Sequence, residues 1–102
     1  METTRKPIVY VVNQGGHDVD KAKAFGELVI LTQDKVNVFA TDRVIAEMTV
    51  KLKDFDATKD FILLSGAIIL NVIAMKLIEP GLSGIRVLLY NFHLDRYIVR
   101  NI

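Results

Sequence analysis

Apolar residues in this chain gather in short runs that are separated by polar stretches. Four such runs occupy residues 8–12, 28–31, 61–64 and 85–90. Because they are short and rich in Val, Ile, Leu and aromatic residues, they predict strands that are buried on both faces of a sheet. Residues 96–100 instead alternate between polar and apolar side chains, which predicts a half-exposed final strand.

The segments between these runs carry helical signals. Residues 18–25 favour a short helix, and Gly26 stands where a helix C′ glycine belongs. Residues 41–52 place apolar side chains at helical spacing, and residues 67–78 predict a helix that is apolar almost all round. Residues 36–39 fit either a brief strand or an extended connection. The N-caps that we expect are Asp18 or Asp20, Thr41 or Asp42, and Ser65.

This order of elements predicts an α/β fold. Strands that alternate with helices favour a small three-layer, Rossmann-like or flavodoxin-like parallel sheet, with helices on both faces and right-handed crossovers. The last two strands form a C-terminal antiparallel hairpin at one edge. We expect residues 1–7 to be a flexible N-terminal lead and residues 8–102 to be a single α/β domain. The order of the strands stays open at this point.

Composition narrows the classes of function. The chain has 102 residues with 13 Lys+Arg against 12 Asp+Glu, which is too balanced a charge for nucleic-acid binding. It has no cysteine, no signal peptide and no apolar run near the ~20 residues of a membrane span, so we expect a cytoplasmic protein. A hydrophobic content of 51% is high for so small a domain and predicts a homo-oligomer.

The first predicted strand opens into a loop of polar residues and glycines. In open α/β sheets ligands bind beyond the carboxyl ends of the strands, and paired glycines let main-chain N–H groups approach an anion. We therefore expect a small anionic or nucleotide-like ligand at this loop. The alternative is that the glycines only make a tight turn, because neither the dinucleotide nor the P-loop spacing is present. The candidate ligand-binding residues are Asn13, Gln14, Gly15, Gly16 and His17.

A second pair of candidates, Ser65 and Gly66, ends the third predicted strand. If the first and third strands are neighbours, Ser65 and Gly66 form the opposite wall of the same crevice. Capping preferences favour the simpler interpretation that Ser65 is the N-cap of the next helix. Asn71, inside that apolar helix, needs a partner if it is buried, either a nearby main-chain group or a second copy of the chain.

Catalysis finds less support. Ser65, His17 and Asp18 have the residue types of a hydrolytic triad, but adjacent His and Asp side chains rarely point together. A metal site at His17, Asp18 and Asp20 would lack ligands. The other histidine, His93, lies in a predicted turn. We expect no catalytic residues, no metal and no cofactor, and we keep a nucleotide phosphoesterase as a weaker alternative.

The combination of four short segments resembles small proteins of bacteriophages. They are residues 11–18, 26–29, 63–66 and 70–72. The resemblance implies a viral protein in the host cytoplasm and carries over no catalytic residues. In that setting one hypothesis is a non-catalytic protein that captures a host nucleotide or signalling molecule. The other is a structural, assembly or host-interaction protein without a small ligand.

Overall fold

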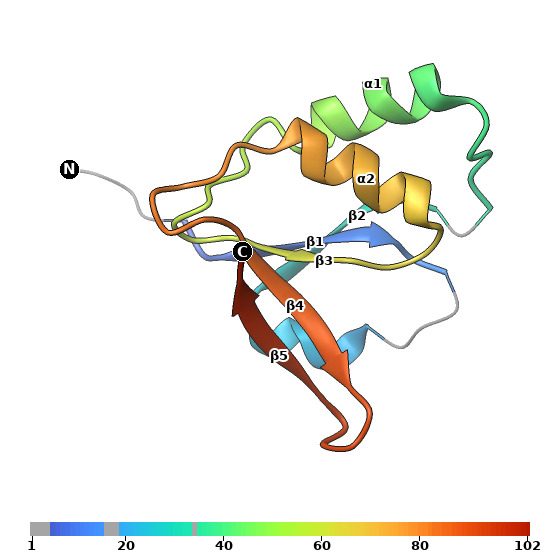
Figure 1. Ribbon diagram of the computed structural model, residues 1–102. Coiled ribbons are helices and arrows are strands. Elements are labelled where there is room, and N and C mark those ends of the chain that lie inside the picture. Colours follow the sequence, from blue (N-terminus) through green and yellow to red (C-terminus); the bar gives the residue numbers. More distant parts are fainter. Residues whose placement is uncertain (1–4, 16–18, 34) are drawn as a thin grey trace.

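A computed structural model describes residues 5–15, 19–33 and 35–102 of the chain. Figure 1 shows a twisted sheet with two longer helices packed on one of its faces. The strands are β1 (Ile8–Asn13), β2 (Glu27–Thr32), β3 (Phe61–Leu63), β4 (Arg86–Asn91) and β5 (Arg96–Asn101). The helices are η1 (Asp20–Ala24), which is a 3₁₀ helix, α1 (Thr41–Lys51) and α2 (Ile68–Leu77).

The strands form one mixed sheet in the order β2-β1-β3-β4-β5. β1, β2, β3 and β4 are parallel, while β5 runs antiparallel to β4. The predicted α/β class and the C-terminal antiparallel hairpin are therefore confirmed. β1 lies between β2 and β3, so the chain steps to one side of β1 first and then returns to the other side.

This reversal also explains where the helices lie. The connection from β1 to β2 steps in the opposite direction to the connections that contain α1 and α2. Crossovers of the same hand that step in opposite directions lie on opposite faces of a sheet. Accordingly α1 and α2 share one face, and η1 lies on the other (Figure 1). Helices were expected on both faces. In the part of the chain that the structure describes, the second face carries the short 3₁₀ helix η1 and no other helix.

Alternate strand residues supply the cores on the two faces, as the pleat of a strand requires. On the α1 and α2 face, Tyr10, Val12 and Ile62 pack with residues such as Met48 and Leu70. On the η1 face, Val9, Val11, Leu63 and Leu88 pack with Ala22 of η1 and Tyr97 of β5. The continuous apolar runs of β1 and β3 are explained by this burial on both faces.

Of the two alternatives for residues 36–39, the brief strand is not formed; the segment is a connection with a turn at residues 38 and 39. Several other local predictions were wrong. The N-caps of α1 and α2 are Ala40 and Ala67, neither with a side-chain hydrogen bond, so Thr41, Asp42 and Ser65 are not the caps. Asp20 begins η1 inside the helix, and Asp18 lies outside the described residues.

Gly26 follows η1 as predicted, but for a different reason. Its φ is not among the positive values, so the left-handed C′ conformation is not what requires glycine here. A Cβ on Gly26 would lie 2.4 Å from the carbonyl oxygen of Pro7. Glycine is needed because the chain before β1 passes directly against the start of β2, where Glu27 N–H donates to that same oxygen.

Candidate functional site

The carboxyl ends of β1 and β2 are joined by the side chain of Asn13. This side chain is buried, and its amide nitrogen donates to Thr32 Oγ1 at 2.9 Å and to the carbonyl oxygen of Gln33 at 2.8 Å. The hydroxyl of Thr32 in turn donates to the carbonyl oxygen of Val12 at 2.7 Å. A buried amide needs such partners, and both acceptors of the Asn13 amide nitrogen lie at the end of β2.

The carboxyl ends of β1 and β3 are joined by Ser65. The main-chain N–H of Asn13 donates to Ser65 Oγ at 3.0 Å, and the hydroxyl of Ser65 donates back to the carbonyl oxygen of Asn13 at 2.7 Å. The side chain of Asn71 then holds Ser65: its Oδ1 accepts from Ser65 N–H at 2.9 Å, and its Nδ2 donates to the carbonyl oxygens of Ser65 and Ala67. We call Asn13, Thr32, Ser65 and Asn71 the strand-end network.

Glycine is required at the turn between β3 and α2. Gly66 has a φ of +76°, and a Cβ there would lie 2.6 Å from Asn13 Cβ. On the other side of the network, the main-chain N–H of Gly15 donates to Asn13 Oδ1 at 2.8 Å. The first predicted loop and the second are thus in direct contact through Asn13.

The structure therefore brings together Asn13, Gln14, Gly15, Ser65 and Gly66 at one edge of the sheet. Gly16 and His17 lie outside the described residues. The hydrogen-bonding groups of Asn13 and Ser65 are already occupied by partners within the protein, namely main-chain groups and the Thr32 hydroxyl. Gln14 is exposed, and its N–H donates to the carbonyl oxygen of Thr32. Asn71 met its expected need with nearby main-chain groups. What the network does is fix the spacing of three parallel strands.

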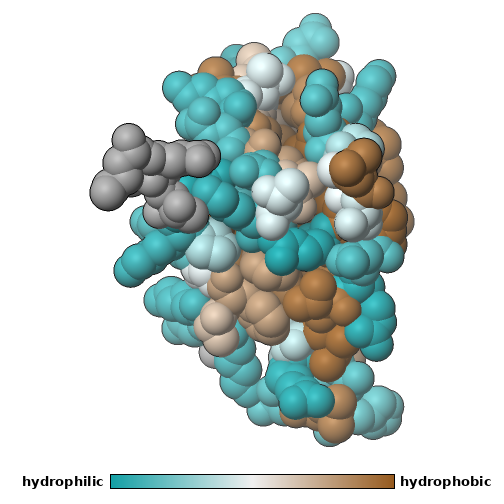
Figure 2. All heavy atoms as spheres, turned by 90° about the vertical axis from the view of Figure 1, so that its left-hand side faces the viewer, coloured by the Kyte–Doolittle hydropathy of each residue, from teal (hydrophilic) through white to brown (hydrophobic). Residues whose placement is uncertain are grey.

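Beside this network lies an apolar hollow on the exposed side of α2. Its volume is about 530 Å³, and Leu64, Ser65, Gly66, Ile68, Val72 and Met75 line it. Ile68 is 82% exposed and Val72 is 56% exposed, although both are large aliphatic residues. In Figure 2 apolar surface runs down the right-hand side of the molecule, the side on which α2 and the hairpin face the viewer of Figure 1. This hollow offers apolar contacts and no charged group of its own.

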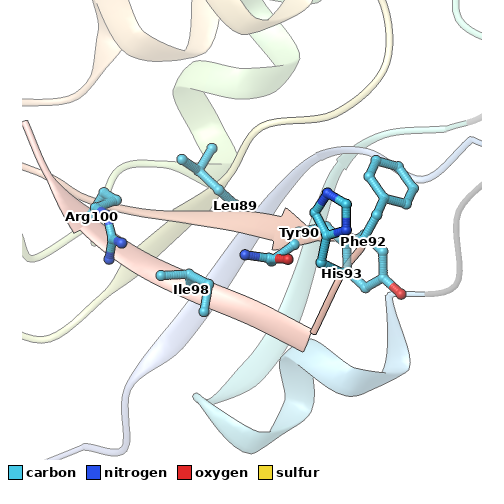
Figure 3. A pocket seen from close by; sticks show the side chains of 7 residues that line it. Leu89, Tyr90, Phe92, His93, Ile98 and Arg100 are labelled. Atoms are coloured by element: carbon cyan, nitrogen blue, oxygen red, sulfur yellow. The ribbon is translucent and has the colours of Figure 1, made fainter. Parts of the chain in front are cut away.

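A second hollow, of about 370 Å³, follows the β4–β5 hairpin. Figure 3 shows Leu89 and Ile98 on its two strands, with Arg100 toward one end and Phe92 and His93 at the turn. No helix follows β4 before the chain turns back, so this part of the sheet lacks the cover that α1 and α2 give to β1 and β3. Leu89, within β4, is 46% exposed, and Phe92, in the turn that follows, is 83% exposed.

Two ion-pair clusters lie apart from the strand-end network. The buried carboxylate of Asp60 accepts two hydrogen bonds from the Arg5 guanidinium, at 2.6 and 2.7 Å, and this pairing raises the pKa of Arg5. It also accepts from the N–H groups of Ile8 and Asp56, so it fixes the chain that enters β1. Sequence reasoning missed this role of Asp60, because Arg5 and Ile8 are distant from it along the chain.

The other cluster joins the hairpin to η1. Asp95 accepts a hydrogen bond from the Tyr90 hydroxyl and pairs with Lys21 of η1 at 2.5 Å. These two donors, Lys21 first, lower the pKa of Asp95, and the hydrogen bond to Asp95 raises the pKa of Tyr90. Asp95 has a φ of +52°, which fits its place in a tight turn.

In the ranges that the structure describes, no group of three or more His, Asp or Glu residues is placed to hold a metal ion. Within those same ranges, no helix is long and apolar enough to cross a membrane. The described residues form a mixed α/β domain with a polar network whose groups bond one another, an apolar hollow beside α2 and a hollow of mixed character along the hairpin.

A family model described as Phage Pam3 gp32-like protein matches residues 7–102. The chain therefore belongs to this phage protein family, which confirms the resemblance drawn from the sequence. No curated protein and no solved structure matches the chain.

Proposed function

We propose that this phage protein is a non-catalytic interaction module that forms a homo-oligomer through α2. The observation that carries the proposal is a row of apolar side chains on that helix, of which Ile68 and Val72 are exposed and Met75 is partly buried. Ile68, Val72 and Met75 follow one another at spacings of four and three residues, which is the spacing of a helix–helix seam. The side of α2 that faces the sheet is formed by Leu70, Ile73 and Ala74, and Met75 also packs in part against this core.

A second copy of α2 is the occupant that suits this seam. Residues 61–75 contain no charged side chain, so two seams can approach without like-charge repulsion. About a two-fold axis perpendicular to α2 the two helices run antiparallel, and each row of apolar residues packs against the same row of the other copy. The apolar hollow beside Ser65 and Gly66 extends the surface that such a contact buries. Large exposed apolar patches on soluble proteins are typical of such contacts.

The test compares two valine-to-glutamate variants. Val72→Glu places an unpaired carboxylate in the seam, and burying it there is costly, so the oligomer should dissociate to monomers. Val50→Glu is the matched control, because Val50 is 67% exposed on α1 and belongs to no hollow described above. Light scattering coupled to gel filtration measures the mass of each variant. A monomeric wild type, or an equal loss of mass in both variants, would overturn the proposal.

A second candidate function is the capture of a small anionic ligand at the strand ends. It is favoured by the strand order, because the carboxyl ends of β1 and β3 meet where the direction of chain progress reverses. The order 2-1-3-4-5 is that of flavodoxin-like folds, in which ligands bind at this point. Gln14 and Gly15, with Gly16 and His17, would contact the ligand from one side, and Ser65 and Gly66 would close the other.

The phage family implies that such a ligand would be met in the host cytoplasm. Native mass spectrometry of the gently purified protein tests this candidate. A bound small-molecule mass that is lost in Gln14→Ala and His17→Ala supports it. Gln33→Ala is the control, because Gln33 is an exposed amide at the end of the neighbouring strand and contributes only its carbonyl oxygen to the network. A protein with no added mass, also after incubation with a panel of nucleotides, would remove this candidate and leave the interaction module.

A further inference from the structure

The two edge strands of the sheet differ in how their main-chain groups are covered. At the β2 edge, Lys51 of α1 donates to the carbonyl oxygens of Ile30 and Leu31, both at 3.1 Å. Glu47 holds the same ammonium group at 3.0 Å. A charged side chain on main-chain carbonyls is a common way to protect a sheet edge from pairing with another chain. The β2 edge is therefore protected by α1.

The β5 edge has no such cover from a helix in the described part of the chain (Figure 1). Ile102 and Ile85 exchange two main-chain hydrogen bonds, so Ile102 points its main-chain groups toward β4. In an antiparallel pair the direction of these groups alternates along the strand. The N–H and C=O groups of Val99 and Asn101 therefore point away from β4, and the Val99 oxygen is covered only by the guanidinium of the adjacent Arg100.

The side chains of β5 add a charge pattern to this edge. Arg96, Ile98 and Arg100 alternate along the strand and so lie on one face, which is the face that carries the hairpin hollow. Both arginines are exposed, and within residues 5–15, 19–33 and 35–102 neither forms an ion pair. The hollow beside Ile98 and Leu89 has room for an apolar side chain.

This charge pattern disfavours a second copy of β5 as the added strand. In a two-fold antiparallel pair centred on Ile98, Arg96 of each copy would lie opposite Arg100 of the other. If the pair is centred on Val99, the two Arg100 side chains become diagonal neighbours. Like charges directly opposite each other destabilise such pairs, and long side chains also reach their diagonal neighbours.

We propose that β5 accepts an added strand from a different protein. In this strand an apolar residue lies between two acidic residues, with one residue of any type on each side of it. The segment pairs antiparallel to β5 through its main chain, as in other cases of strand addition. Its two carboxylates lie opposite Arg96 and Arg100, and its apolar side chain lies opposite Ile98 and enters the hairpin hollow. This surface is distinct from the α2 seam, so the proposal goes beyond self-association.

The experiment uses a labelled peptide with the core Glu-Thr-Ile-Thr-Glu and its charge-reversed form with two lysines. Fluorescence anisotropy should show binding of the acidic peptide and at least about tenfold weaker binding of the basic one. In the Arg96→Glu/Arg100→Glu double variant the preference should reverse. Arg43→Glu/Lys53→Glu is the control, because it changes the net charge equally on and just after α1.

Main-chain pairing is tested separately with methylated peptides. A methyl group on the nitrogen of the first threonine, which lies opposite Val99, removes a donor that faces β5, and binding should be lost. A methyl group on the isoleucine nitrogen faces away from β5 and should change binding little. Amide exchange should slow at Val99 when the acidic peptide is bound.

Equal binding of the acidic and basic peptides, equal effects of the two methyl positions, or no binding at all would overturn the proposal. Running the same titration in the monomeric Val72→Glu background separates this inference from the proposed function. Binding should persist there whether or not α2 mediates self-association.

Discussion

At the scale of the residue, Asn13 shows how one side chain can organise a sheet edge. Its side chain forms hydrogen bonds with Thr32 and Gln33 at the end of β2 and with Gly15 in the loop after β1. Its main-chain N–H donates to Ser65, which follows β3. The sequence marked Asn13 as important because two amides and two glycines follow a buried strand. It did not show that the Asn13 groups would be hydrogen-bonded within the protein, because Thr32 and Ser65 are distant from Asn13 along the chain.

We predict that Asn13→Ala lowers the free energy of unfolding by about 2–3 kcal/mol, because it leaves buried donors and acceptors without partners. The measurement is urea unfolding followed by circular dichroism. Asn37→Ala is the control: Asn37 also bonds a nearby main-chain N–H, but in an exposed turn. A loss in Asn13→Ala no larger than in this control would show that the network contributes little.

Asp95 supports a prediction on pH. Because its folded pKa is lowered, its contribution to stability is present above the ordinary carboxyl pKa and is lost as the pH falls through the folded value. Since the ion pair with Lys21 is the first cause, Lys21→Met should raise the pKa of Asp95 toward its ordinary value. Lys23→Met, which removes a pair with Asp20 instead, should leave that pKa unchanged. A carboxyl NMR titration measures both, and equal shifts would contradict the assignment.

At the scale of the element, the apolar sequence of α2 is explained by two contacts of the helix, one with the sheet and one proposed with a second copy. Its residues are apolar almost all round because one side packs on the sheet and the other forms the exposed seam. What the sequence missed is its beginning: Ser65 was expected as the cap, but its hydroxyl is used by β1, and the helix begins after Ala67 without a side-chain cap. Tertiary hydrogen bonds outweighed the local capping preference.

The turn before α2 gives a prediction at this scale. Gly66→Ala should destabilise the protein by about 2 kcal/mol or more, because it combines a left-handed φ with a contact between the new Cβ and Asn13. Gly81→Ala should cost less, since its new Cβ would meet Ala57 Cβ at 3.2 Å and its φ is not positive. Thermal unfolding of the two variants compares them. Equal midpoints would mean that the turn relaxes freely.

At the scale of the whole molecule, the fold leaves one side incompletely covered. A hairpin replaces the helix that would otherwise follow β4, so apolar side chains of α2 and of the hairpin remain on the surface. The high hydrophobic content of the chain is explained in part by this surface. The two proposed contacts, through α2 and through the β5 edge, both lie on the uncovered side or at its border.

The sequence by itself determined the elements, because strand and helix periodicity are local properties of side chains. The predicted strands agree with β1, β2, β3, β4 and β5 to within one or two residues, and the predicted helices are likewise present. It also determined the antiparallel hairpin, since a short turn permits no other connection. The tertiary structure alone decided the strand order, the placement of both longer helices on one face, and the pairing of Asp60 with Arg5. These depend on contacts between residues far apart in the chain, whose free energies no local pattern records.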